Sequence, residues 1–441
     1  MSEVDLKYLK SLTQEWFKDA FYGDLYLERV ETLKIVVEPD RIDEVNWGVE
    51  EGSAIRKITP EFTNKLYFSN GFFEKGLREL ILQTKRPCEE EVSKKLTTRL
   101  EYLEELKRKV WSTKEIKHYR LFFSEVVKEV WIFTSEGKFL SDKREYTKLG
   151  VIVVAEKDGR LERGYEVAGR KINFEQVKDS EEFLLLPERA SRLAMTMLSA
   201  KKAPAGVMPV VLAGQAGGTM IHEAVGHGLE ADHAEEGLSV YSGKIGEKVA
   251  SPLITVVDDP TIESLYGSYQ VDDEGVYAQP VVLIENGRLK TYLYDRLTAF
   301  KYQKTPNGHG RRQDYRSIPI PRMANTYIAK GPHKSEDILK SIEKGILVKK
   351  MGGGEVNPLT GDFVFEVREG YYIDKGEIAY PVKGATLVGN GPKVLEITDM
   401  VGEDLHFEPG VCGKDGQGVP VSDGQPTLRI PELTVGGTVE E

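Results

Sequence analysis

The strongest chemical motif in the chain is a glutamate beside the first of two closely spaced histidines. Residues 220–227 read Met-Ile-His-Glu-Ala-Val-Gly-His, which places Glu223 between His222 and His227. Imidazole nitrogens are common zinc ligands, and a glutamate next to a ligand can act as a general base on water. In the zinc-protease pattern His-Glu-x-x-His, the two histidines are four residues apart and share one helical face. This motif therefore indicates metal-assisted hydrolysis, although its two histidines are one residue further apart than in that pattern.

The extra residue predicts a local departure from regular helix geometry. Histidines five residues apart lie about 140° apart around an α-helix, so their rings would diverge. A π-bulge, or a helix that ends between them, would bring them together, and Gly226 and Gly228 favour either departure. The alternative is two unrelated histidines, since the chain has seven and His233 follows on a polar stretch.

A cysteine in the C-terminal part of the chain is a third candidate ligand. Cys412 lies in a run of glycines and charged residues at 410–418, which predicts an accessible loop suited to a thiolate. Two imidazoles and one thiolate would leave a fourth position for water, as in catalytic zinc sites. Cys88, the other of only two cysteines, follows Pro87 and is expected to be a small buried hydrophobe. Two cysteines cannot build a disulfide framework.

The segment from His222 to Asp232 resembles the signature of the TldD/TldE (PmbA) family, on the side of its metallopeptidase subunit. The resemblance continues through further blocks in the same order, over about residues 205–438. The N-terminal half resembles the family only in its alternation of helices and sheet. The blocks are 267–268, 272–275, 307–312, 321–327, 352–361, 412–417, 424–427 and 433–437.

The resemblance implies zinc held by His222, His227 and Cys412, with Glu223 as the general base on a zinc-activated water. It implies hydrolysis of flexible or unfolded peptides, in a homodimer or in a heterodimer with a TldE/PmbA-like chain that lacks the metal ligands. All ligand positions are present here, which favours the catalytic subunit. The alternatives are a non-catalytic peptide-binding or scaffolding subunit with a structural or vestigial metal site, and a regulator that only binds a protein partner.

Residues outside the motif give further candidates for the site. An oxyanion needs a cationic or hydrogen-bonding neighbour, and His309 and then Arg312 are the candidates for oxyanion or substrate binding. The alternative is a glycine-supported turn whose arginines pair with surface carboxylates. Gly353 and Gly354 belong to a triple glycine without the Lys-Ser/Thr of a phosphate loop, so we expect them to admit a peptide backbone. Residues 272–274, three acids, indicate a calcium site or, more commonly, a solvated turn.

The surrounding pattern predicts an α+β protein of two domains. Residues 1–185 are expected to form an antiparallel sheet with helices, and residues 186–441 a β-rich domain that carries the metal-binding helix. The expected helices are 5–21, 72–111 and 187–200, and the expected strand regions are 24–70, 119–156, 207–213 and 252–441.

Composition narrows the classes of function. The 441 residues carry a formal net charge of −11, which argues against a general nucleic-acid binder. The first ten residues alternate charge and apolarity, unlike a secretory signal. The longest apolar runs, at 149–155 and 207–213, are far shorter than the ~20 residues of a membrane helix. A cytoplasmic protein without nucleic-acid or membrane partners is therefore expected.

Overall fold

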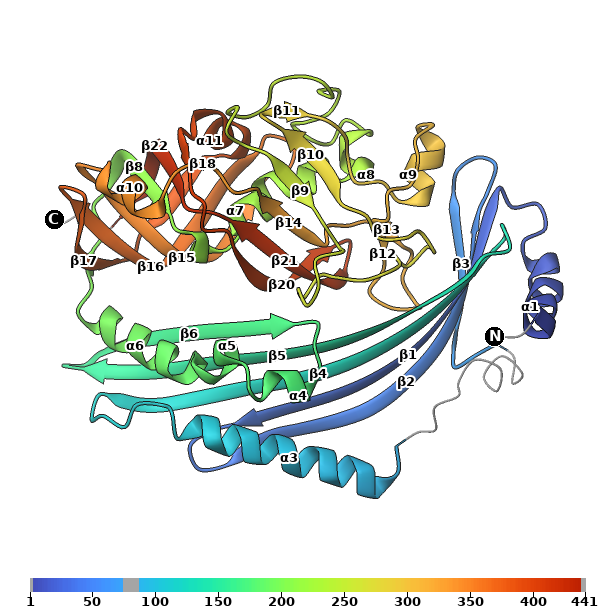
Figure 1. The fold of residues 1–441 in the computed structure, drawn as a ribbon, viewed down its shortest axis with the longest axis horizontal. Helices are drawn as coiled ribbons and strands as arrows, with labels where there is room; N and C mark the ends of the chain where they lie inside the picture. The colour runs from blue at the N-terminus through green and yellow to red at the C-terminus, as the bar shows by residue number, and fades with distance from the viewer. Residues whose placement is uncertain (1–2, 74–86, 438–441) are drawn as a thin grey trace.

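The computed structural model describes residues 3–73 and 87–437 and shows an α+β protein built on two β-rich layers (Figure 1). The N-terminal sheet with its helices forms the lower layer in this view, and the C-terminal sheets form the upper one. Within the described ranges, no helix combines the length and apolarity needed to cross a bilayer. The predicted fold class is confirmed.

The lower layer is one antiparallel sheet of six long strands in the order β3-β2-β1-β4-β5-β6. Two predicted turns connect neighbours within it: Gly137 and Gly159 both have positive φ (81° and 75°), the conformation that glycine adopts without cost. The predicted strand regions are thereby confirmed. The strands are β1 (Tyr22–Val37), β2 (Ile42–Ile58), β3 (Asn64–Asn70), β4 (Ile116–Thr134), β5 (Phe139–Lys157) and β6 (Arg160–Arg170).

Helices cover one face of this sheet, while α1 (Glu3–Trp16) lies at its far end (Figure 1). Apolar side chains of β1, β4 and β5 pack there against α3 (Glu89–Lys107), α4 (Phe174–Val177), α5 (Glu181–Leu184) and α6 (Leu186–Leu198). Pro187 lies in the first turn of α6, where it needs no N–H partner. The helix predicted over 72–111 falls partly outside the described residues. The domain boundary after residue 185 stays a prediction, and the packing of α6 on this sheet favours a later one.

The upper layer holds two larger sheets, with strand orders β15-β8-β22-β18-β16-β17-β7 and β11-β10-β9-β14-β21-β20. Its helices are short, as the sequence predicts. The strands are β7 (Lys201–Lys202), β8 (Gly206–Leu212), β9 (Val256–Asp258), β10 (Val281–Glu285), β11 (Arg288–Leu289), β12 (Gly310–Arg311), β13 (Ile320–Pro321), β14 (Asn325–Ile328), β15 (Lys344–Val356), β16 (Asp362–Asp374), β17 (Glu377–Lys383), β18 (Thr386–Asn390), β19 (Met400–Val401), β20 (His406–Lys414), β21 (Gln417–Gln425) and β22 (Leu428–Gly436). The helices are α7 (Thr219–Ile221), α8 (Ala231–Ala234), α9 (Arg296–Lys301), α10 (Ser335–Lys340) and α11 (Gly391–Ile397).

Two glycine-rich segments expected as loops are strands instead. Residues 352–354 lie inside β15, at register shifts in its pairing with β16. Residues 410–418 form the turn end of the β20–β21 hairpin, which turns at Asp415 and Gly416 with φ values of 49° and 73°. Positive φ at both central residues is typical of a tight hairpin turn. The loop expectation was wrong because glycines at bulges and at a two-residue turn were taken for an irregular segment.

Candidate metal centre

The backbone of the histidine motif is a single π-helical turn over His222–Gly226, between α7 and a short 3₁₀ turn at His227–Leu229. The N–H of His227 donates to the carbonyl of His222, which closes the wide turn. The two imidazole rings consequently lie close together in an edge-to-face arrangement, with centroids 5.0 Å apart and planes at 89°. The predicted departure from a regular helix is confirmed. A Cβ on Gly226 would lie 2.1 Å from the sulfur of Met323, so that side chain would have to shift.

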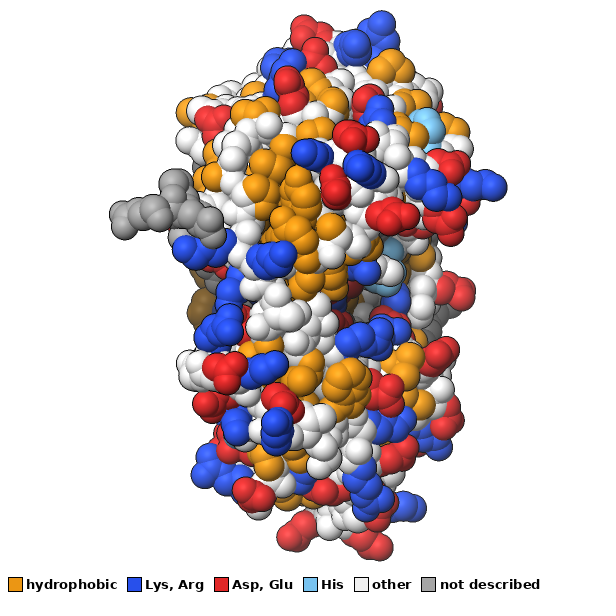
Figure 2. All heavy atoms as spheres, turned by 90° about the vertical axis from the view of Figure 1, so that its left-hand side faces the viewer, with side chains coloured by type: hydrophobic (Ala, Val, Ile, Leu, Met, Phe, Trp, Pro, Cys, Tyr) orange, Lys and Arg blue, Asp and Glu red, His pale blue; other side chains and the backbone are white. Residues whose placement is uncertain are grey.

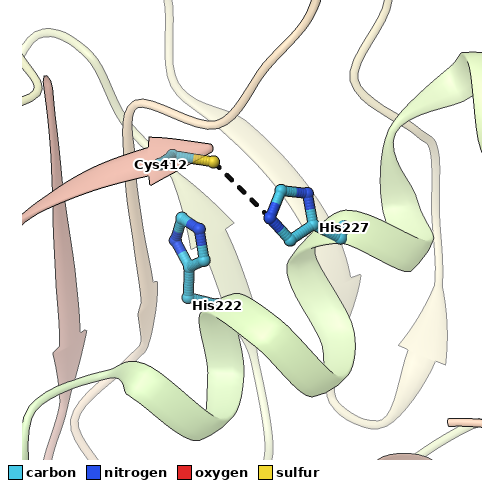
Figure 3. A group of neighbouring side chains, drawn as sticks. All are labelled: His222, His227 and Cys412. Atoms are coloured by element: carbon cyan, nitrogen blue, oxygen red, sulfur yellow. Dashed lines mark hydrogen bonds between the residues drawn. The ribbon is translucent and has the colours of Figure 1, made fainter. Parts of the chain in front are cut away.

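Strand β20 brings the cysteine to the two histidines. The Sγ of Cys412 lies 3.5 Å from Nε2 of His227 (Figure 3). One potential ligand atom from each of Cys412, His222 and His227 lies within 4.8 Å of the others, and all three residues are buried. The structure thus brings the three predicted ligands together, although Cys412 is 185 residues from His227 in the sequence. Their donor set of two nitrogens and one sulfur is the set that zinc prefers.

A carboxylate supports each imidazole from behind. Nδ1 of His222 lies 2.7 Å from Oδ1 of Asp423 on β21, and Nδ1 of His227 lies 2.8 Å from Oε2 of Glu230. Such bonds fix the proton on Nδ1, orient the ring and leave Nε2 for a metal. Sequence reasoning did not assign a role to either acid. Glu230 could have been found from its position three residues after His227, whereas nothing local marks Asp423.

Charges within the cluster shift the pKa values of its members. Burial lowers the pKa of His222, but Asp423 and Cys412 outweigh it and raise the pKa well above its usual value. Burial also lowers the pKa of His227, but Glu230 and Cys412 outweigh it and raise that pKa to about 9. Burial raises the pKa of Cys412, but the two imidazoles lower it to about 6. The thiol is therefore prepared as a thiolate, the form that binds metals.

Glu223 is placed beside the cluster rather than in it. Its side chain is 40% exposed, and Oε2 lies 3.9 Å from Nε2 of His227. Together with His222, Glu223 lines a pocket of about 190 Å³ whose opposite wall is the β20 segment 408–411. A carboxylate that reaches solvent next to three buried ligand atoms can accept a proton from a water held there.

The lower-ranked site candidates lie elsewhere. Nε2 of His309 is 2.9 Å from Asp258, and a guanidinium nitrogen of Arg312 is 3.2 Å from Asp24. His309 and Arg312 are almost fully buried, so these contacts favour the structural alternative, with buried rather than surface carboxylates. An oxyanion role for either remains a prediction. Gly353 has open space where a Cβ would be, whereas a Cβ on Gly354 would meet Phe365 at 2.1 Å.

Two further expectations were wrong. The acids at 272–274 are buried and do not form a solvated turn. Arg144 pairs with Asp273 at 2.9 Å and Arg56 pairs with Glu274, while Asp272 accepts from the backbone N–H groups of Glu274, Val276 and Gly310. Cys88 is exposed, because it lies at the surface where the chain enters α3.

Residues 205–437 match the model of the PmbA/TldA metallopeptidase C-terminal domain, and residues 89–198 match that of the central domain. The Metalloprotease TldD homolog of Haemophilus influenzae is 45% identical over 71% of this chain and 67% of its own. The Zinc metalloprotease TldD homolog of Saccharolobus solfataricus is 26% identical over 98% of this chain and 100% of its own.

A solved structure shares the fold. TldE from Thermococcus kodakarensis superimposes with a TM-score of 0.76 at 18% identity, covering 98% of this chain and 100% of that one. The two family models together span more than three quarters of the 441 residues. On the strength of these matches, the chain belongs to the PmbA/TldA metallopeptidase family.

Proposed function

We propose that the protein is a zinc-dependent peptidase of the TldD type that hydrolyses flexible or unfolded peptides. The observation that carries the proposal is the convergence of His222, His227 and Cys412 beside the exposed carboxylate of Glu223. The donor set fits zinc: two imidazoles already oriented through Nδ1, and a thiol whose pKa is lowered to about 6. The names of the relatives, metalloprotease and zinc metalloprotease, support it.

In this proposal each side chain has a distinct task. His222, His227 and Cys412 would hold zinc, which when bound polarises a peptide carbonyl and lowers the pKa of water. Glu223 accepts a proton from the attacking water and delivers it to the leaving amine. Asp423 and Glu230 hold the two rings in place through Nδ1.

The strand that carries the cysteine supports the choice of substrate. β20 is the last strand of its sheet, so one of its edges has no strand partner, and residues 408–411 of this strand line the pocket with Glu223. A free edge can pair with the backbone of an extended peptide while reading its side chains weakly. A stably folded protein cannot present such a strand, so we infer loose sequence preference and selection for unfolded chains.

We also propose that the chain works as a homodimer or with a TldE/PmbA-like partner. Hydrophobic side chains gather on one end of the upper layer (Figure 2). Three exposed valines, Val207, Val388 and Val364, lie on the outer face of the larger sheet. Val364 pairs with Val388, Val388 with Thr434 and Thr434 with Val207, so the four residues form one row across the strands. Exposed apolar rows of this kind are typical of protein interfaces.

The test is metal analysis followed by a degradation assay on one polypeptide in its native state and destabilised by mutation. The assay is run with the protein alone and with the protein co-expressed with a relative. About one zinc per chain and faster cleavage of the destabilised form, both lost with a chelator, are expected. Zinc without hydrolysis, even with the partner, would favour the alternative of a scaffolding subunit. Equal cleavage of both forms, with the native one shown to stay folded, would contradict the selection for unfolded chains.

A further inference from the structure

A second hollow lies on the face of the N-terminal sheet that the helices leave open. It measures about 660 Å³ and is lined mainly by alternate residues of β4, β5 and β6, with one residue from the upper layer. Aromatic side chains form its floor. A Cβ on Gly150 would touch the rings of Tyr165 and Phe122 at 3.5 and 3.8 Å, so the glycine leaves a depression between them.

Every charged side chain that lines this hollow is a cation, in a protein with a net charge of −11. Lys34 pairs with Glu44 at 3.0 Å. The other three, Lys148, Arg163 and Arg368, have no carboxylate partner among the described residues. The guanidinium of Arg368 stacks over the Tyr165 ring at 5.2 Å, and the ammonium of Lys148 lies 5.9 Å from the Tyr266 ring.

Burial acts on Lys148 without compensation. Its pKa is lowered, and burial is the cause. Half-buried lysines are usually paired, because an unpaired ammonium loses hydration without gaining a partner. An anion from outside the chain would restore that pairing.

Register arranges the three cations along a line. Arg163 pairs in the sheet with Val154, which is six residues from Lys148 on β5, and Tyr165 under Arg368 pairs with Ile152. At about 3.3 Å per residue, the line is roughly 20 Å long. A single carboxylate cannot contact cations spread over that length. An extended peptide of about six residues can, because alternate side chains point to one face.

The line leads toward the metal centre. Lys148 pairs in the sheet with Gly169, and a Cβ on Gly169 would come within 2.9 Å of Pro409. Pro409 in turn lines the pocket that contains His222 and Glu223. We infer that Lys148, Arg163 and Arg368 form a binding track for acidic side chains of an extended peptide substrate, with neighbouring apolar side chains resting on Phe122 and Tyr165. This inference rests on the proposed function and specifies the substrates of that same site.

The first test compares two unstructured peptides that differ only in Glu or Gln at alternate positions. The metal-loaded protein, with its partner if one is required, should show kcat/KM at least threefold higher for the Glu peptide at low salt, and the ratio should approach one at 0.5 M salt, where charges are screened. Equal values at low salt would overturn the inference. Equal cleavage of the Glu and Gln peptides that falls for both on C-terminal amidation would overturn it too, because the ligand would then be the terminal carboxylate.

The second test measures binding in the Glu223→Gln variant by fluorescence anisotropy, with and without R368Q or K148Q. Either substitution should lower the Glu/Gln affinity ratio at least threefold. Lys157→Gln, the same change on an exposed lysine of β5 outside the hollow, should leave the ratio unchanged. Identical ratios in the track and control variants would overturn the inference. Should the track variants not fold, protection from acetylation in the otherwise unaltered protein decides: the Glu peptide should protect Lys148 but not Lys157.

The two proposals fail separately. Selective binding of the Glu peptide with no hydrolysis of either peptide would contradict the peptidase and support the track. Hydrolysis of both peptides with equal binding would support the peptidase and contradict the track.

Discussion

Two regions of this protein bury charged and polar side chains together, and they differ in where the partners lie. In the interdomain ion network, formed by Asp24, Arg56, Arg144, Asp273, Glu274 and Arg312, every acid already contacts a guanidinium. In the metal centre, Asp423 and Glu230 lie behind the imidazoles, and the nitrogens in front converge on a thiol.

Burial alone therefore does not mark a functional site in this protein. Members of both regions are nearly inaccessible, and both contain groups with shifted pKa values. In the network, each of the three acids is already paired with an arginine of the chain. In the centre, two imidazoles and a thiol come together, and His222 lines a pocket beside the partly exposed carboxylate of Glu223.

The largest effect is expected from Glu223→Gln. An amide cannot accept the proton of water, so turnover should fall about 10²–10⁴-fold. Zinc content and melting temperature should stay as in the unaltered protein, because Glu223 is not among the buried ligand atoms. Near-normal turnover in a peptide cleavage assay would mean that another group is the base.

Arg56→Met should break the network. The substitution leaves Asp24 and Glu274 buried without this cation, which costs about 3–5 kcal/mol. Urea denaturation measures the loss, and the zinc content of the remaining folded protein should be unchanged. A loss below about 1 kcal/mol would show that the network does not stabilise the contact between the layers.

Asp423→Asn should weaken the centre without destroying it. An amide oxygen can still accept from Nδ1 of His222, but the negative charge behind the ring is lost. Zinc affinity, measured by competition with a chelating dye, should fall about 10–100-fold. Asp423→Ala, which removes the acceptor as well, should fall further. Unchanged affinity in both variants would exclude a positioning role for this acid.

The smallest effect is expected from Arg316→Gln, a matched change at the rim of the same contact between layers. Arg316 pairs with Glu50, but their side chains are 38% and 57% exposed. Exposed pairs contribute about 0.2–1 kcal/mol, so stability should change by less than about 1 kcal/mol. A loss as large as that of Arg56→Met would remove the distinction between buried and exposed pairs.

Local patterns predicted much of the fold and the unusual turn at the centre. The five-residue spacing of His222 and His227 predicted either a π-bulge or an early helix end, and the structure contains the π-turn. Alternating strands, turn glycines and Pro187 likewise located the elements of the lower layer.

Features that depend on distant segments could not be predicted in this way. Asp423 is 201 residues from His222, and Arg56 is 218 residues from Glu274. No local spacing records such contacts. For the same reason, the sequence did not reveal that the acids at 272–274 are buried or that His309 and Arg312 pair with carboxylates.

The edge of β20 affects how an isolated C-terminal fragment would refold. An unpaired edge strand is a template for self-association, and proteins usually protect such edges. Here Pro409 removes one backbone donor, and it packs beside Gly169 of β6, where a Cβ would come within 2.9 Å of the proline. The lower layer thus shields this edge at Pro409, while Val411, two residues further along β20, stays exposed. A fragment limited to residues 205–437 would lose that shield and should aggregate through β20 during refolding, even though its own sheets are intact.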